Sequence, residues 1–110
     1  MTTTINMIDY PNRLLTAEVW NYGEANIGPT SAAVKAAPGV LGVAQVLTAD
    51  PGETVTFYDA AALEGGNIVL GILPLDVAGV QIYFRRPAIN GIYAKFSVED
   101  GTGVVAVGYL

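Results

Sequence analysis

Apolar and polar residues alternate along much of the last two-thirds of this chain. The alternation is clearest over residues 92–99 (IYAKFSVE), and it recurs over residues 54–59 (TVTFYD) and 80–85 (VQIYFR). A period of two is typical of a β-strand that buries one of its faces. Each of these three runs is therefore predicted to be a strand of a partly buried sheet.

Three further runs are mostly apolar: residues 39–48 (GVLGVAQVLT), 67–73 (NIVLGIL) and 104–110 (VVAVGYL). The run 67–73 is apolar on both faces, which predicts a strand that is covered on both sides. Turn signals such as Pro51-Gly52 and Asn90-Gly91 separate the runs. Six short strands with turns between them predict an all-β fold, a small antiparallel β-sandwich of the jelly-roll or immunoglobulin-like type.

The same alternation predicts the core of this sandwich. Successive side chains of a strand point to opposite faces, so the apolar positions of one parity face inward. The predicted core residues are Val55, Phe57, Ile82, Phe84, Ile92, Phe96 and Val107.

The first 37 residues lack this patterning and are predicted to form an N-terminal arm and a connector, which leaves residues 38–110 as the sandwich domain. Residues 23–38 are rich in small side chains and indicate a connector, with Ser31 able to cap a single helical turn over residues 32–37. Residues 14–22 fit both a strand and a helix, and the extended conformation is favoured.

Large apolar side chains are nevertheless frequent in the arm, and segments that stay disordered are typically poor in them. The arm is therefore expected to pack on the sandwich or on a neighbouring subunit. Tryptophan is enriched among the residues that dominate interfaces, so Trp20 fits an interface as well as it fits a core. The predicted interface residues of the arm are Tyr10, Leu14, Trp20 and Tyr22.

The chain has 110 residues, of which 52% are hydrophobic and only 14% are charged. No apolar run approaches the ~20 residues of a membrane helix, and the first residues do not resemble a signal peptide. The apolar excess is therefore expected to lie in subunit contacts, in a homo-oligomer or in lattice-bound copies, rather than in a membrane. With five basic residues and a net charge of −5, nucleic acid is not an expected partner.

Histidine and cysteine are both absent, which removes the commonest general base and the most readily activated nucleophile. We therefore expect no enzymatic activity and no cofactor. Four carboxylates near turns, Asp50, Glu53, Asp59 and Glu64, suit calcium as a ligand set. Their spacing is not that of an EF-hand, and turn chemistry accounts for Asp50 and Asp59, so no metal site is predicted.

Two other groups of residues have a functional and a structural interpretation. Arg85 and Arg86 are the only local concentration of basic residues, and they suit either an anchor for carboxylates or a solvated strand end. The tyrosines Tyr58, Tyr83 and Tyr93 fall on the less apolar faces of their strands. They fit a carbohydrate-binding platform or, as we favour, ordinary cross-strand packing.

Three short motifs occur in a fixed order along the chain: residues 54–59 (TVTFYD), residues 90–93 (NGIY) and the valine-rich end. In this respect residues 38–110 resemble small β-sandwich virion proteins of tailed bacteriophages, of the head decoration, cement or head-fibre type. The arm and Arg85-Arg86-Pro87 depart from that pattern, and the departure in the arm leaves the docking target open.

The resemblance implies a structural virion protein that binds and stabilises a capsid. Its partner would be the major capsid protein or another virion protein, and it would be assembled into the virion in the host cytoplasm. The alternative is a small carbohydrate- or receptor-binding module of a phage fibre or tail. An acidic hydrolase is a third possibility, but no carboxylate pair with the necessary separation stands out.

Overall fold

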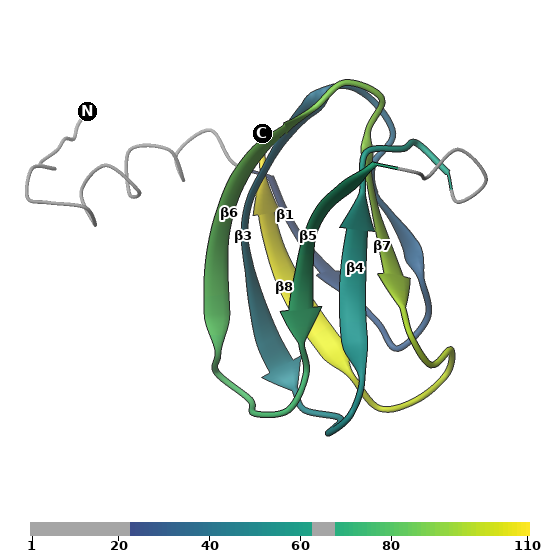
Figure 1. The fold of residues 1–110 in the computed structure, drawn as a ribbon, viewed down its shortest axis with the longest axis vertical. Helices are drawn as coiled ribbons and strands as arrows, with labels where there is room; N and C mark the ends of the chain where they lie inside the picture. The colour runs from purple at the N-terminus through teal and green to yellow at the C-terminus, as the bar shows by residue number, and fades with distance from the viewer. Residues whose placement is uncertain (1–22, 63–67) are drawn as a thin grey trace, which may run out of the picture.

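The computed structural model describes residues 23–62 and 68–110, which form a sandwich of two antiparallel four-stranded sheets (Figure 1). Sheet A contains, in spatial order, β1 (Gly23–Ile27), β8 (Val104–Tyr109), β3 (Gly39–Thr48) and β6 (Gln81–Ala88). Sheet B contains β2 (Ala32–Lys35), β7 (Ile92–Phe96), β4 (Thr54–Tyr58) and β5 (Val69–Pro74). Within these two ranges there is no helix long and apolar enough to cross a membrane.

The strands pair as in one long hairpin that has been rolled up. The first strand pairs with the last, the second with the seventh, the third with the sixth and the fourth with the fifth. Two further pairings, β3 with β8 and β4 with β7, join these strand pairs into two four-stranded sheets. Most strand pairs therefore join segments that lie far apart in the sequence.

The prediction of an all-β antiparallel sandwich is confirmed. β3 has the predicted bounds, and β4, β7 and β8 lie within the runs predicted for them. β6 is longer than predicted because it continues through Pro87 to Ala88. Proline donates no backbone hydrogen bond, and β6 tolerates it because β6 is an edge strand of sheet A.

The prediction of a connector over residues 23–38 is wrong, as is the helical turn after Ser31. The segment forms β1 and β2, one in each sheet, so the sandwich begins before Pro38. β1 pairs with β8 through all five of its residues, and Ile27 and Val34 are buried. Pairing with neighbouring strands outweighs the weak strand propensity of alanine and glycine here.

The core lies between the two sheets. Five of the seven predicted core residues are buried, and the other two, Ile82 and Phe84, are partly buried and pack against the core from the edge strand β6. The largest fully buried side chains are Phe57, Phe96, Leu41, Leu73, Leu75, Ile92, Val46, Val55, Val105 and Val107.

The prediction that the run 67–73 is covered on both sides is wrong for β5, the strand that this run contributes. β5 is the edge strand of sheet B, and its apolar residues divide between the two faces. Leu70 and Leu73 are buried, whereas Val69 and Ile72 are exposed. In the described part of the chain, apolar side chains are therefore exposed on an edge strand.

Candidate interaction surface

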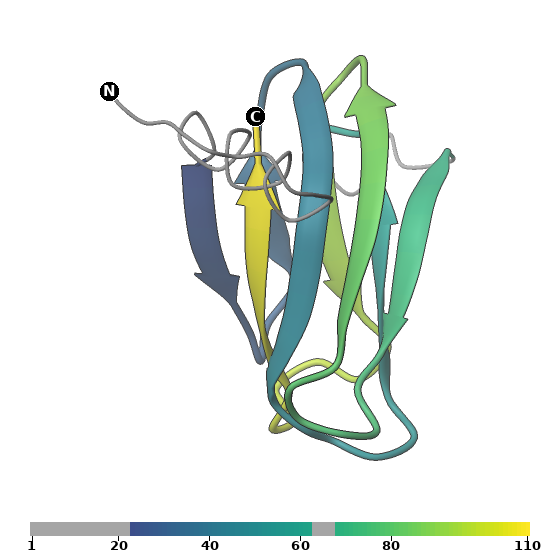
Figure 2. The same cartoon turned by 90° about the vertical axis from the view of Figure 1, so that its left-hand side faces the viewer.

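Exposed apolar side chains are concentrated on one side of the sandwich. β5 and β6 are the edge strands of their sheets on this side, and they lie next to each other across the sandwich (Figure 2). Among the described residues, nine large hydrophobic side chains are exposed, and six of them come from these strands and the chain beside them. We call this group the β5–β6 side, and it consists of Ile68, Val69, Ile72, Val77, Val80 and Tyr83.

On sheet B the β5–β6 side continues across the outer face of the neighbouring strands. Register pairs Val69 with Tyr58 on β4, and Tyr58 with Tyr93 on β7. Both tyrosines are half-buried, so part of each ring remains exposed. The apolar surface of β5 thus extends onto an aromatic pair.

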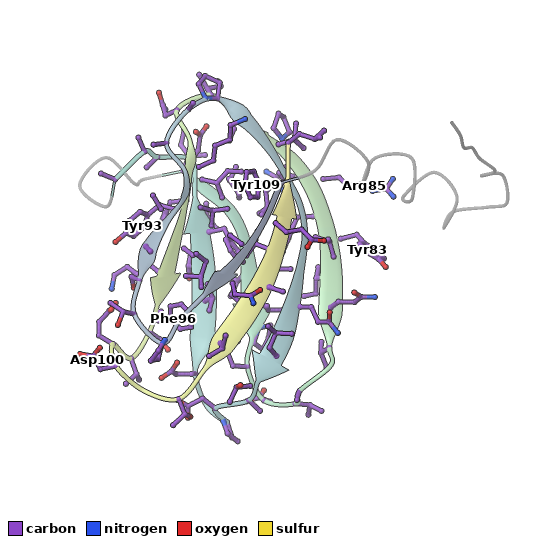
Figure 3. All side chains as sticks on the ribbon, turned by 180° about the vertical axis from the view of Figure 1, so that it is seen from behind. Tyr83, Arg85, Tyr93, Phe96, Asp100 and Tyr109 are labelled. Atoms are coloured by element: carbon purple, nitrogen blue, oxygen red, sulfur yellow. The ribbon has the colours of Figure 1, made fainter. Side chains whose placement is uncertain are left out.

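On sheet A the surface is formed by the first half of β6. The side chain of Gln81 donates a hydrogen bond from Nε2 to the hydroxyl of Tyr83 at 3.0 Å, and this contact orients the tyrosine along the strand. Tyr83 points away from the sandwich, as does Arg85 (Figure 3). An exposed aromatic ring beside a cation is a common feature of protein interfaces.

A β-bulge explains why two consecutive arginines are both exposed. Arg86 faces Leu41 on β3 and Tyr83 faces Val43, so the register shifts between these two pairs. Arg85 lies at the shift with a φ of 52°, a left-handed conformation that is uncommon for a residue other than glycine. Without the bulge, strict alternation would turn one of the two arginines inward.

The structure brings some of the predicted site residues together and separates others. Arg85 and Arg86 lie on β6, the strand that contributes Tyr83 to the β5–β6 side. Tyr58 and Tyr93 pair on sheet B, but Tyr83 belongs to sheet A, so the three tyrosines do not form one platform. The predicted interface residues of the arm, Tyr10, Leu14, Trp20 and Tyr22, lie outside the described residues.

The four carboxylates considered as calcium ligands do not gather at one point. Asp50 and Glu53 precede β4, whereas Asp59 follows it, so they lie at opposite ends of that strand. Glu64 lies outside the described residues. Of the three described carboxylates, only Asp50 and Glu53 are brought together.

Asp59 has a structural role in the turn before β7. Its carboxylate accepts hydrogen bonds from the backbone N–H of Asn90 at 2.7 Å and of Ile89 at 3.1 Å. These bonds, Asn90 first, hold the pKa of Asp59 below its usual value. The buried carboxylate thus fixes the connection between β6 and β7.

Sequence reasoning missed a shallow hollow on the outer face of sheet A. Its volume is about 150 Å³, and its floor contains Ala106 and Gly108 of the central strand β8. Polar side chains from three different strands, Glu24, Asn26, Gln45 and Gln81, surround it. The alternation over residues 80–85 placed Gln81 on a polar strand face, but Glu24 and Asn26 lie in the segment predicted to be a connector. The convergence of the four side chains depends on the strand order.

Comparison of the chain with models of known protein families, with characterised proteins and with solved structures found no match.

Proposed function

We propose that this chain is a structural virion protein of a tailed bacteriophage, which docks on the major capsid protein or another virion protein and reinforces the particle. The observation that carries the proposal is the β5–β6 side. Large apolar side chains exposed together usually mark a surface that is covered by a partner. The sequence resemblance of residues 38–110 to phage virion proteins is the reason for proposing a capsid or other virion protein as that partner.

We further infer that the sandwich is a jelly roll. Eight strands that pair as a rolled hairpin are the arrangement expected of two Greek keys wrapped into two sheets. Viral capsid domains and lectins both use this architecture. The fold is compatible with the proposal, but it does not select it, because one fold serves many functions.

The docking surface has a defined chemistry. Val69 and Ile72 would be buried against apolar groups of the partner, while Arg85 and Arg86 would pair with carboxylates at the border of the contact. Many copies on one lattice, or copies that also contact each other, would bind far more tightly than a single copy. The arm residues Tyr10, Leu14, Trp20 and Tyr22 would add a second contact on a neighbouring subunit.

The test compares two variants whose wild-type side chains are equally exposed. Ile72 on the β5–β6 side and Val98 in the β7–β8 connection are both 51% exposed. Purified phage particles lacking this protein are mixed with wild-type chain, with Ile72→Asp or with Val98→Asp, and co-sedimentation is measured. Wild type and Val98→Asp are expected to bind, whereas Ile72→Asp is expected to lose binding.

Two results would count against the proposal. If mass spectrometry finds no copies of the chain in the complete virion, it is not a structural component of the particle. If the two aspartate variants bind like the wild type, docking does not use the β5–β6 side.

A second candidate function is carbohydrate binding by a fibre or tail module, and the hollow on sheet A favours it. Amide and carboxylate side chains such as Gln45 and Glu24 are suitable hydrogen-bond partners for sugar hydroxyls. The hollow is smaller than the ~300–1,000 Å³ of usual ligand sites, which is why this function stands second. A glycan array would test it, with Gln45→Ala expected to abolish selective binding and Tyr93→Ala, on the other sheet, expected to preserve it.

A further inference from the structure

Three connections meet at the end of the sandwich where β4 begins. They are residues 49–53 between β3 and β4, residues 75–80 between β5 and β6, and residues 97–103 between β7 and β8. Backbone hydrogen bonds hold the first two together, from Asp50 to Leu75 at 2.8 Å and from Leu75 to Glu53 at 3.0 Å. Asp50 and Glu53 are therefore held on a rigid frame.

Two carboxylates converge within this frame. A Cβ added to Gly101 would lie 2.7 Å from Oδ2 of Asp50 and 2.7 Å from Oε2 of Glu53. Two oxygens that are both this close to one point are at most about 5.4 Å apart, twice that distance. Glycine at position 101 thus leaves room for both carboxylates to approach this point.

Glu53 is buried without a partner. Its exposed fraction is 3%, and neither carboxylate oxygen accepts a hydrogen bond from a donor group of any described residue. Asp50 differs, because it is half-buried and its Oδ2 accepts a hydrogen bond from the backbone N–H of Thr102 at 3.1 Å. A buried carboxylate that is neither paired nor hydrogen-bonded is strongly unfavourable, so Glu53 requires either a proton or a cation.

We propose that Asp50 and Glu53 bind a calcium ion between them. Both oxygens of Glu53 are available, and calcium accepts a bidentate carboxylate and an irregular shell of oxygen ligands. The described residues contain no group of three or more acidic side chains arranged to hold a metal, so water would complete the shell. Because the protein supplies only two carboxylates, we expect weak calcium binding, with a dissociation constant of about 10⁻⁴–10⁻³ M.

A proton is the natural competitor for this site. Burial raises the pKa of Glu53, and it is raised further by the hydrogen bond that the protonated carboxyl can donate to Asp50, by the charge of Asp50 and by the charge of Glu99. The backbone bond from Thr102 instead lowers the pKa of Asp50, so Glu53 is the group that takes up the proton. Calcium would displace that proton, and its affinity is therefore expected to rise with pH.

The test is a thermal melt of the full chain at pH 8, first in chelator and then in about 10 mM CaCl2, tenfold above the weak end of the expected range. Calcium is expected to raise the Tm of the wild type by at least about 4 °C. Glu53→Gln removes the charge but keeps the shape of the side chain. In chelator its Tm should therefore be higher than that of the wild type, and calcium should not change it. Glu24→Gln, which neutralises an exposed carboxylate on β1, should respond like the wild type.

An amide NMR titration with CaCl2 locates the ion. The amide resonances of Gly101 and Thr102 are expected to shift in the wild type and to stay fixed in Glu53→Gln. Equal responses of the wild type and Glu53→Gln to calcium would place the ion elsewhere and overturn the proposal. A second result would also overturn the proposal: the Tm of the wild type does not respond to calcium but falls between pH 5 and pH 8, and Glu53→Gln does not show this fall. The pair would then hold only a proton.

Discussion

The ring of Phe84 on β6 occupies the space in front of Gly71 on β5 that any side chain at position 71 would need. Phe84 also packs against Phe57 in sheet B, with the ring centroids 5.7 Å apart and the planes inclined at 57°. The Phe84 side chain from sheet A therefore covers the edge of the core between β5 and β6. Gly71 is a requirement of this packing rather than of a turn.

Gly71→Ala is expected to destabilise the sandwich by about 1–3 kcal/mol, because the added methyl group overlaps the Phe84 ring. Phe84→Leu would cost stability by itself but would make room for that methyl group. The double variant should therefore be more stable than the sum of the two single effects predicts. Urea unfolding of the four proteins measures this coupling, and strictly additive effects would show that the two residues do not compete for space.

Phe96→Ala is expected to reduce the free energy of unfolding by about 3–5 kcal/mol, since Phe96, the last residue of β7, is fully buried. Val98→Ala, two residues further on at an exposed position, should change it by less than about 0.5 kcal/mol. Denaturant unfolding monitored by circular dichroism gives both values. A small effect of Phe96→Ala would mean that the core rearranges to fill the space.

The strands that could be predicted from the sequence are those in which buried positions carry apolar residues and exposed positions carry polar ones. β4 and β7 bury alternate large apolar residues, so their period of two is visible without any knowledge of their neighbours. β1 and β2 are built mainly from small and polar residues and bury little more than Ile27 and Val34. Their stability comes from pairing with β8 and β7, which no local pattern shows.

The candidate functional surfaces depend even more on topology. Asp50 and Glu53 were visible as turn residues, but Gly101, which closes on them, is about fifty positions further along the chain. The adjacent arginines were visible too, whereas the bulge that exposes both is set by pairing with β3. Sequence reasoning thus identified the residue types and missed the contacts that give them a role.

Asp59→Asn is expected to destabilise the protein at neutral pH and to have a smaller effect in acid. The folded-state pKa of Asp59 is lowered by its bonds to the backbone of Asn90 and Ile89. Its contribution to stability is therefore present above the unfolded pKa of about 3.9 and is lost as the pH falls through the folded value. Thermal melts of wild type and variant from pH 7 to pH 2 should converge, with the exposed Glu24→Gln as a control; a constant difference would contradict the assignment.

Deletion of residues 1–22 is expected to leave the sandwich folded, whereas deletion of residues 1–37 is expected to unfold it. The longer deletion removes β1 and β2, and with them the outer strand of each sheet and the buried side chains of Ile27 and Val34. β8 and β7 would then become edge strands with unpaired backbone groups. Circular dichroism and thermal melts of the two truncated chains test this difference. Particle binding by the shorter deletion is a second readout. If this chain folds but no longer binds particles, residues 1–22 carry docking affinity. If it binds fully, the β5–β6 side is sufficient. A melt of the longer deletion that matches the full chain would show that β1 and β2 add no stability, and the sandwich would then begin at Pro38, as the composition of the chain indicated.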